Sequence, residues 1–196
     1  KKDLQSIQMI YQIADIAMNP RHKIKKIIGR PLEFYLGMTG KQKDDRVLEL
    51  LRLIEIPEEF ADRYPGQLSG GEKQRICIAR ALAAEPELII CDEVTSALDQ
   101  LVAKGILDLL LNLQKELGVS YLFITHDLAT VKSIADEIVV MYQGKVVEQG
   151  SKTDILMPPH APYTELLLSS VPEMDPDWLS NLVEKRKRGE SPTAES

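Results

Sequence analysis

One segment says most about the fold of this 196-residue chain: Leu68-Ser69-Gly70-Gly71-Glu72-Lys73-Gln74-Arg75. Ser69 is a good helix N-cap, and apolar residues then recur at helical spacing and predict a helix that ends near Ala84. Gly70 and Gly71 leave no side chain between the free N–H groups of the helix start and an approaching anion. The segment therefore predicts a phosphate site at a helix N-terminus, with an ordinary capped helix after a glycine turn as the alternative if the segment stood alone.

A predicted strand with an acidic end follows this helix. Residues 88–91 are apolar without alternation, which is typical of a parallel strand buried on both faces. Asp92 would lie at the carboxyl end of the strand, where α/β sheets place ligands, and it is a candidate to hold the Mg²⁺ of a nucleotide. Glu93 is the candidate general base that polarises an attacking water. A surface Asp-Glu pair that ends a strand is the alternative interpretation of the same two residues.

A second predicted strand delivers a histidine to the same edge of the sheet. Residues 121–124 are rich in aromatic and apolar side chains and lead through one threonine to His126. In that place His126 can hydrogen-bond a γ-phosphate and hold both the attacking water and Glu93. Lone histidines are more often structural, and that interpretation is kept for His22 and His160.

The order and spacing of these motifs resemble one family, the nucleotide-binding subunits of ABC transporters. The resemblance implies ATP and Mg²⁺ as cofactors. Ser96-Ala97-Leu98-Asp99 resembles the D-loop, which runs along the dimer interface, and Gln12 resembles the Q-loop glutamine that touches Mg²⁺ and links hydrolysis to the membrane partner. The implied fold is α/β, an incomplete RecA-like P-loop NTPase core with an α-helical signature subdomain and a C-terminal extension. The implied site residues are catalytic Glu93 and His126, nucleotide-binding Gln12, Ser69, Gly70, Gly71, Glu72, Gln74 and Asp99, and metal-binding Asp92 and Gln12.

The phosphate loop G-x-x-x-x-G-K-[ST] is absent from the sequence. Its Gly-Lys pair occurs at Gly40-Lys41 and Gly144-Lys145, but Tyr35 and Val139 stand where the first glycine is required, and neither pair is followed by Ser or Thr. In the resembled family this loop lies upstream of the Q-loop. We therefore expect the chain to be the C-terminal portion of a longer polypeptide; a natural protein that lost the loop is the alternative. Because the loop holds the β- and γ-phosphates, the chain alone is expected to hydrolyse no ATP.

Two further segments are similar to dipeptide and oligopeptide importers. Asn19-Pro20-Arg21 is similar to the S-L-N-P-R that follows their Q-loop. Residues 159–167 resemble their P-x-H-P-Y-T-x-x-L-L extension, which nickel and glutathione relatives share. Glu72 stands where glutamine is commoner, and Val94 stands where proline is usual, which suggests a divergent branch. One such branch joins two ATPase halves in a single chain.

The resemblance also implies partners. A second ABC ATPase subunit or half would form a head-to-tail dimer, in which Ser69 and the two glycines cover the γ-phosphate held by the other unit. Membrane permease subunits would dock directly, an extracytoplasmic substrate-binding protein would act indirectly, and the subunit would lie peripherally on the cytoplasmic face of the inner membrane. Ile13, Ile16 and Met18 are candidate apolar docking residues for the permease, with burial in the core as an equal alternative.

Composition fits a soluble globular piece. The chain is 44% hydrophobic and 28% charged, and its net charge of −6 gives no support for nucleic-acid binding. No apolar run approaches the ~20 residues needed to cross a bilayer. Cys77 and Cys91 lie within helix and strand patterns and are interpreted as small buried apolar residues, not as a disulfide or metal pair.

The chain is predicted to run through five segments. Residues 1–12 are expected to be the tail of a core strand, and residues 137–149 to form short strands around a Gln143-Gly144 turn. The segments are 1–18, the end of the core strand and the Q-loop; 19–85, the α-helical subdomain with the signature motif; 86–150, the RecA-like core; 151–183, the peptide-importer-type extension; and 184–196, a disordered tail.

These features favour an ATP-binding and ATP-hydrolysing subunit that powers a membrane importer, with peptides as the favoured cargo. One alternative is a soluble ABC-type ATPase that acts on nucleic acid or the ribosome. Such proteins usually carry long coiled coils or basic linkers, which this sequence lacks. The other alternative is a truncated, non-catalytic binding module.

Overall fold

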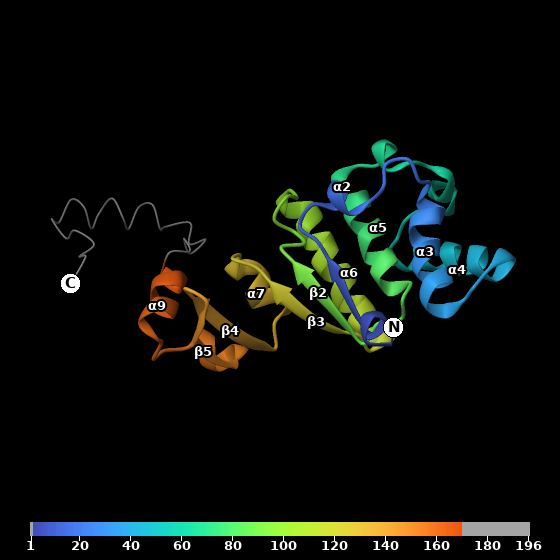
Figure 1. Ribbon diagram of the computed structural model, residues 1–196. Helices are drawn as coiled ribbons and strands as arrows, with labels where there is room; N and C mark the ends of the chain where they lie inside the picture. Colours follow the sequence, from blue (N-terminus) through green and yellow to red (C-terminus); the bar gives the residue numbers. More distant parts are fainter. Residues whose placement is uncertain (1, 170–196) are drawn as a thin grey trace. The chain divides into compact units, whose positions relative to one another are not determined.

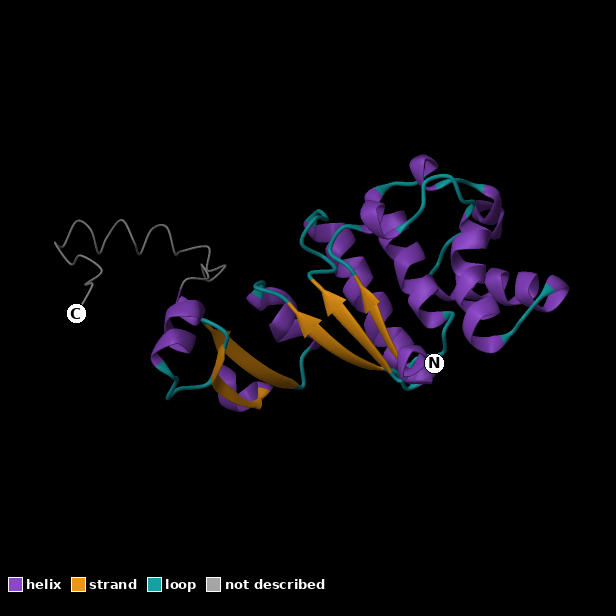
Figure 2. Cartoon of the chain, in the orientation of Figure 1, coloured by secondary structure: helices purple, strands orange, loops and turns teal. Residues whose placement is uncertain are grey.

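The structure is a computed structural model that describes residues 2–169. The chain forms two compact units (Figure 1). The first unit is Lys1–Ile134, which holds a parallel sheet and most of the helices (Figure 2). The second is Ala135–Ser196, of which residues 135–169 are described. The tail predicted at 184–196 lies outside the described residues. Within the described part, no helix is long and apolar enough to cross a membrane.

The sheet of the first unit has three parallel strands in the order β1 (Ile7–Ile10), β2 (Leu88–Asp92) and β3 (Ser120–Ile124). The registers place Ile10 beside Cys91 and Asp92 beside Ile124. Because the strands are parallel, their carboxyl ends meet at one edge of the sheet. The prediction of two parallel strands that end at Asp92 and just before His126 is confirmed.

Helices α5 (Gly70–Leu82) and α6 (Gln100–Leu117) share one buried core with this sheet. Ile76 of α5 and Ile106 of α6 are fully buried together with Ile89 and Cys91 of β2. Helix α6 ends at Gly118, which is in the left-handed conformation (φ 68°). The core therefore fixes the start of each helix relative to the sheet edge.

The segment between β1 and α5 is helical. It holds α2 (Ala14–Ala17), α3 (Ile24–Leu36) and α4 (Gly40–Leu53), then two short 3₁₀ turns, η1 (Glu58–Asp62) and η2 (Pro65–Gln67). The buried faces of α3 and α4 contact each other and α5. Residues of these helices and of α6 belong to one hydrophobic core. The structure therefore does not mark off residues 19–85 from the rest of the first unit, and the α-helical subdomain at 19–85 stays a prediction.

The N-terminal segment differs from its prediction. Lys2–Ser6 forms helix α1 rather than the start of a strand, and only Ile7–Ile10 is strand. The run at 2–6 is mostly polar and lacks the alternation or continuous apolar character of a strand.

Only one face of β2 is deeply buried, although the apolar run predicted two. Ile89 and Cys91 are fully buried, whereas the alternate residues Leu88 and Ile90 are half-buried. On the same face as Ile90, Leu122 of β3 is 51% exposed. Side chains alternate between faces along a strand, and among the described residues the core helices pack against the Ile89 face.

The second unit is built on a hairpin. Strands β4 (Glu137–Tyr142) and β5 (Lys145–Ser151) pair antiparallel, and Gln143 and Gly144 both have positive φ (48° and 75°), as the predicted two-residue turn requires. Helices α8 (Lys152–Leu156) and α9 (Pro162–Ser169) follow. Glu148 of β5 accepts a hydrogen bond from the Ala161 N–H at 3.1 Å and so ties the chain just before α9 to the hairpin.

Both cysteines are free and buried, as predicted, and should be unreactive in the folded protein. Burial raises the pKa of Cys77 to about 11 and that of Cys91 to about 12. The thiolate is the reactive form, so at pH 8 roughly one thiol in a thousand or fewer is reactive. We expect negligible alkylation by iodoacetamide at pH 8 in native buffer and modification of both thiols in guanidinium chloride, measured by mass spectrometry. Rapid native labelling of either cysteine would contradict this burial.

Candidate functional site

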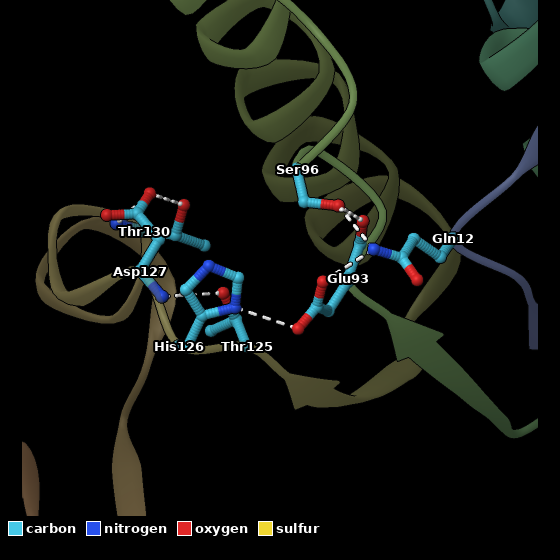
Figure 3. Close-up of polar contacts among 7 residues, drawn as sticks. All are labelled: Gln12, Glu93, Ser96, Thr125, His126, Asp127 and Thr130. Atoms are coloured by element: carbon cyan, nitrogen blue, oxygen red, sulfur yellow. Dashed lines mark hydrogen bonds and ion pairs between the residues drawn. The ribbon is translucent and has the colours of Figure 1, made fainter.

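Loops from all three strands meet at the carboxyl edge of the sheet (Figure 3). Gln12 follows β1, and His126 follows β3. Glu93 and Ser96 lie in the turn after β2. The parallel arrangement makes this meeting possible, because it brings the ends of strands that are distant in sequence to one edge. Gln12, Glu93 and His126, which the sequence placed in one site, are therefore neighbours.

Both oxygens of the Glu93 carboxylate are engaged. Gln12 Nε2 donates to Glu93 Oε2 at 2.7 Å, and His126 Nδ1 lies 2.8 Å from Glu93 Oε1. The Glu93 side chain is 25% exposed, whereas that of His126 is 77% exposed. The carboxylate is thus held between two partners from different strands, and the histidine stays open to solvent.

The Glu93 backbone lies in the left-handed region, with φ 47°. That conformation costs a non-glycine residue on the order of 1 kcal/mol and persists only where the surroundings hold it. Here the Glu93 N–H donates to the Ile124 carbonyl at 2.9 Å. The Glu93 carbonyl accepts from the N–H of Ser96 at 3.1 Å and from its hydroxyl at 3.0 Å. These bonds hold the turn that places the carboxylate between Gln12 and His126.

Asp127 fixes the chain directly after His126, where α7 (Leu128–Ile134) begins. Its carboxylate accepts from the Ala129 N–H at 2.9 Å and from the Thr130 N–H and Oγ1 at 3.2 and 2.6 Å. Partial burial works to raise the pKa of Asp127, but the hydrogen bonds outweigh it and hold that pKa below its usual value. Asp127 was not among the site residues predicted from the sequence, although an Asp before a helical run is an N-cap signal.

The start of α5 is capped as predicted. Ser69 is the N-cap, and its Oγ accepts from the Glu72 N–H at 3.4 Å. Glu72 Oε2 in turn accepts from the Ser69 N–H at 2.6 Å and from its hydroxyl at 2.8 Å, which completes a capping box. Hydrogen bonds from the amide and then the hydroxyl of Ser69 hold the pKa of Glu72 below its usual value. The Glu72 carboxylate is therefore engaged in capping the helix. Within the described residues, no hydrogen bond or ion pair joins Ser69 or Glu72 to Glu93.

The two glycines after Ser69 have different reasons to be glycine. A Cβ on Gly71 would lie 2.6 Å from Val102 Cγ1 of α6, a distance that requires the structure to shift. A Cβ on Gly70 would meet only Leu98 Cδ2 at 3.7 Å, an ordinary contact. From the sequence, the only reason suggested for glycine at both positions was access of an anion to the helix start. The structure adds close packing against α6 at Gly71.

Three remaining candidates have definite positions. Gln74 is only 2% exposed, and its Nε2 is buried without a hydrogen-bond partner among the described residues, so Gln74 is left out of the site proposed below. Asp99 is the N-cap of α6 and accepts from the Val102 N–H at 3.0 Å. Asp92 is partly buried at the end of β2. In the described part of the chain, no three His, Cys, Asp or Glu side chains group closely enough to hold a metal ion.

The fold is that of an ABC-type ATPase. A solved dimer of the ATP-binding cassette MJ0796, in a post-hydrolysis state bound to ADP and Pi, matches with a TM-score of 0.64 and 34% sequence identity. The match covers 74% of this chain and 62% of that chain. The family model "ABC transporter" matches residues 1–96, and "Oligopeptide/dipeptide transporter, C-terminal region" matches residues 147–196.

The relatives narrow the family. The dipeptide transport ATP-binding protein DppF of Escherichia coli is 43% identical over 173 residues, which are 88% of this chain and 52% of that protein. The oligopeptide transport ATP-binding protein OppF of Bacillus subtilis is 45% identical over 183 residues, 93% of this chain and 60% of that protein. The chain thus spans about half of the length of the relatives it matches. It belongs to the ABC transporter ATP-binding subunits of the dipeptide and oligopeptide type.

The glycines give a direct test of the packing at the start of α5. Gly71→Ala should lower the free energy of unfolding by about 1–3 kcal/mol, because the new methyl overpacks against Val102. Gly70→Ala is the matched control and should change it by less than about 0.5 kcal/mol. Urea unfolding of the complete subunit, followed by circular dichroism, measures both. Equal stability of the two variants would mean that Gly71 and Val102 are not in close contact.

Proposed function

We propose that this chain is part of an ATP-binding subunit that powers peptide import across a membrane, and that ATP is hydrolysed beside Glu93. The observation that carries the proposal is the pair of contacts on that carboxylate, from Gln12 at 2.7 Å and His126 at 2.8 Å. A strand-end carboxylate held in this way can accept a proton from a water molecule. Peptide as cargo is supported by the relatives described as dipeptide and oligopeptide transport proteins.

Glu93 acts as the general base in the proposed reaction. One proton of the attacking water passes to a carboxylate oxygen as the water oxygen bonds to the γ-phosphorus. The bond from that phosphorus to the β,γ-bridging oxygen breaks, and the products are ADP and phosphate. The Gln12 amide stabilises the ionised carboxylate. His126 orients it through Nδ1 and, when protonated, can donate from Nε2 to the γ-phosphate.

The residues at the sheet edge also fit Mg²⁺, which would neutralise phosphate charge during hydrolysis. Mg²⁺ prefers oxygen ligands, and in ATPases it is held by one or two protein groups together with phosphate and water. Asp92 ends β2 with a carboxylate beside the Glu93 turn. Gln12 contacts Glu93 through its nitrogen, so its amide oxygen is left for a ligand. Asp92 and Gln12 are therefore the residues proposed to hold the ion.

The segment from Ser69 to Gly71 would act on a second ABC ATPase subunit or half. The Gly70 and Gly71 N–H groups lie in the first turn of α5, where no intrahelical acceptor exists, and they are free to donate to a phosphate. The match to a dimeric cassette bound to ADP and Pi supports a dimer that binds nucleotide. In such a dimer Asp99, as part of the D-loop, would lie near the interface.

The permease would bind this subunit directly, and the substrate-binding protein would act indirectly. The subunit would sit on the cytoplasmic face of the membrane.

The alternatives are less well supported. The match of residues 147–196 to the oligopeptide and dipeptide transporter C-terminal region favours an importer over an ATPase that acts on nucleic acid or ribosomes. The contacts on Glu93 favour a catalytic role over a binding module.

The proposed docking surface for the permease needs one correction. Met18 is only 4% exposed and belongs to the core, so of the two alternatives burial holds for Met18 and the docking role does not. Its neighbours differ: Ile16 is 81% exposed and Ile13 is 49% exposed. The high exposure of Ile16, on the short helix that follows Gln12, supports a contact with a membrane partner.

In the complete subunit, Glu93→Gln should keep ATP binding but lower hydrolysis by ~10²-fold or more, because the amide cannot accept the proton. The ATP-bound dimer should accumulate, since it closes but cannot turn over. Steady-state phosphate release and size-exclusion chromatography with ATP measure the two effects. Wild-type turnover in Glu93→Gln would refute the assignment of the base and make His126 the candidate.

Ile16→Asp should uncouple ATP hydrolysis from transport and reduce co-purification with the permease, while nucleotide binding stays unchanged. A charge on the exposed helix opposes burial against an apolar partner. Leu117→Asp is the matched control, because Leu117 is an exposed leucine (45%) at the far end of α6. Normal transport and co-purification by Ile16→Asp would place the docking surface elsewhere.

A further inference from the structure

Ser96 lies between two groups of the proposed site. Its hydroxyl is 3.2 Å from Gln12 Nε2 and 3.0 Å from the carbonyl oxygen of Glu93 (Figure 3). From the sequence, Ser96 was only the first residue of the segment that resembles the D-loop. The structure places it beside Gln12, 84 positions earlier in the chain.

The donors and acceptors at this point allow one consistent arrangement. A hydroxyl has a single proton, and the Glu93 carbonyl can only accept, so the Ser96 hydroxyl donates to that carbonyl. Towards Gln12 the Ser96 oxygen must then be an acceptor. The Gln12 amide nitrogen has two protons, of which one goes to Ser96 Oγ and the other to the Glu93 carboxylate. A flipped amide would place its oxygen against the Glu93 carboxylate, which has no proton to donate when ionised, and could bond Ser96 only if that hydroxyl gave up the Glu93 carbonyl.

We propose that Ser96 is a positioning residue that fixes the orientation of the Gln12 amide. With both amide protons taken by Glu93 and Ser96, the nitrogen faces these two residues and the carbonyl oxygen faces away from the Ser96 hydroxyl (Figure 3). The oxygen is thereby presented for a ligand such as Mg²⁺ or its water. This inference rests on the proposed function, because Ser96 is assigned a role in ATP hydrolysis. That role is exerted through Gln12.

Ser96 also acts on the backbone of Glu93. The carbonyl that its hydroxyl binds belongs to the residue with φ 47°, so the same side chain supports the left-handed turn and the Gln12 amide. A test must separate these two effects. Ser133 offers a matched control, because its hydroxyl donates at 2.8 Å to the carbonyl three residues earlier, as that of Ser96 does, without any bond to Gln12.

The experiment uses the complete subunit assembled with its permease and measures ATP hydrolysis against ATP concentration. Ser96→Ala should lower kcat about fivefold, the effect of one ordinary hydrogen bond, and leave KM for ATP unchanged. Ser96→Thr keeps the hydroxyl and should restore turnover. Ser133→Ala should be without effect. In a Gln12→Ala background, Ser96→Ala should cause a smaller loss than in the wild type, because its bond to the amide is gone and only its bond to the Glu93 carbonyl remains to be lost.

Solvent exchange of the Gln12 side-chain amide protons, measured by NMR, gives a readout that does not depend on activity. In the subunit labelled with ¹⁵N-glutamine, the Gln12 side-chain resonances are identified by their loss in Gln12→Ala. Ser96→Ala should speed solvent exchange of one Nε2 proton, because that proton loses its acceptor. Unchanged exchange would overturn the proposal.

The kinetic outcomes separate this inference from the proposed function. If Gln12→Ala alone leaves kcat unchanged, the assigned role of Gln12 fails and the inference fails with it. If Gln12→Ala impairs turnover but Ser96→Ala does not, only the inference fails. An equal loss from Ser96→Ala with and without Gln12, or no rescue by Ser96→Thr, would likewise show that Ser96 does not act through the amide.

Discussion

The site depends on the position of one carboxylate. Glu93 leaves its strand in a left-handed turn, and each oxygen of its side chain meets a donor from a different strand end. Only a parallel sheet brings Gln12 and His126 to the same edge as Glu93, because all of its strands end there. The buried core of β2, α5 and α6 is therefore a condition for the chemistry as well as for stability.

The segment after Gln12 is attached to α5, the helix that Ser69 caps. Lys73 Nζ of α5 forms an ion pair with Asp15 Oδ1 of α2 at 2.6 Å, and Arg80 of α5 hydrogen-bonds the Ala17 carbonyl. The Lys73 side chain is 16% exposed, whereas that of Asp15 is 67% exposed, so the pair lies at the surface and is open to screening by salt. A displacement of α2 would pull on α5. These two bonds join the segment that carries Ile16 to the helix that Ser69 caps.

Much of this arrangement could be predicted from the sequence, because its signals are local. The cap at Ser69, the strands that end at Asp92 and before His126, and the Gln143-Gly144 turn each depend on a few consecutive residues. The convergence of Gln12, Glu93 and His126 could be predicted only because their motifs occur together.

What the sequence did not reveal depends on contacts between distant segments. The steric demand at Gly71 comes from Val102 of another helix, and no pattern within α5 contains it. The burial of Met18 depends on how the helices pack, which is why its local sequence fitted exposure and burial equally. Ser96 meets Gln12 through the tertiary fold alone. Glu72 is different: Ser69 and Glu72 match the capping-box spacing, so this role could have been predicted.

The most direct test of the central claim is a double-mutant cycle on Gln12 and His126, with ATP turnover by the assembled transporter as the measurement. If both residues act by holding the same carboxylate, Gln12→Ala and His126→Ala should each lower kcat, and the double variant should lose much less than the product of the two effects. Strictly multiplicative losses, or wild-type turnover in both single variants, would contradict a site organised around Glu93.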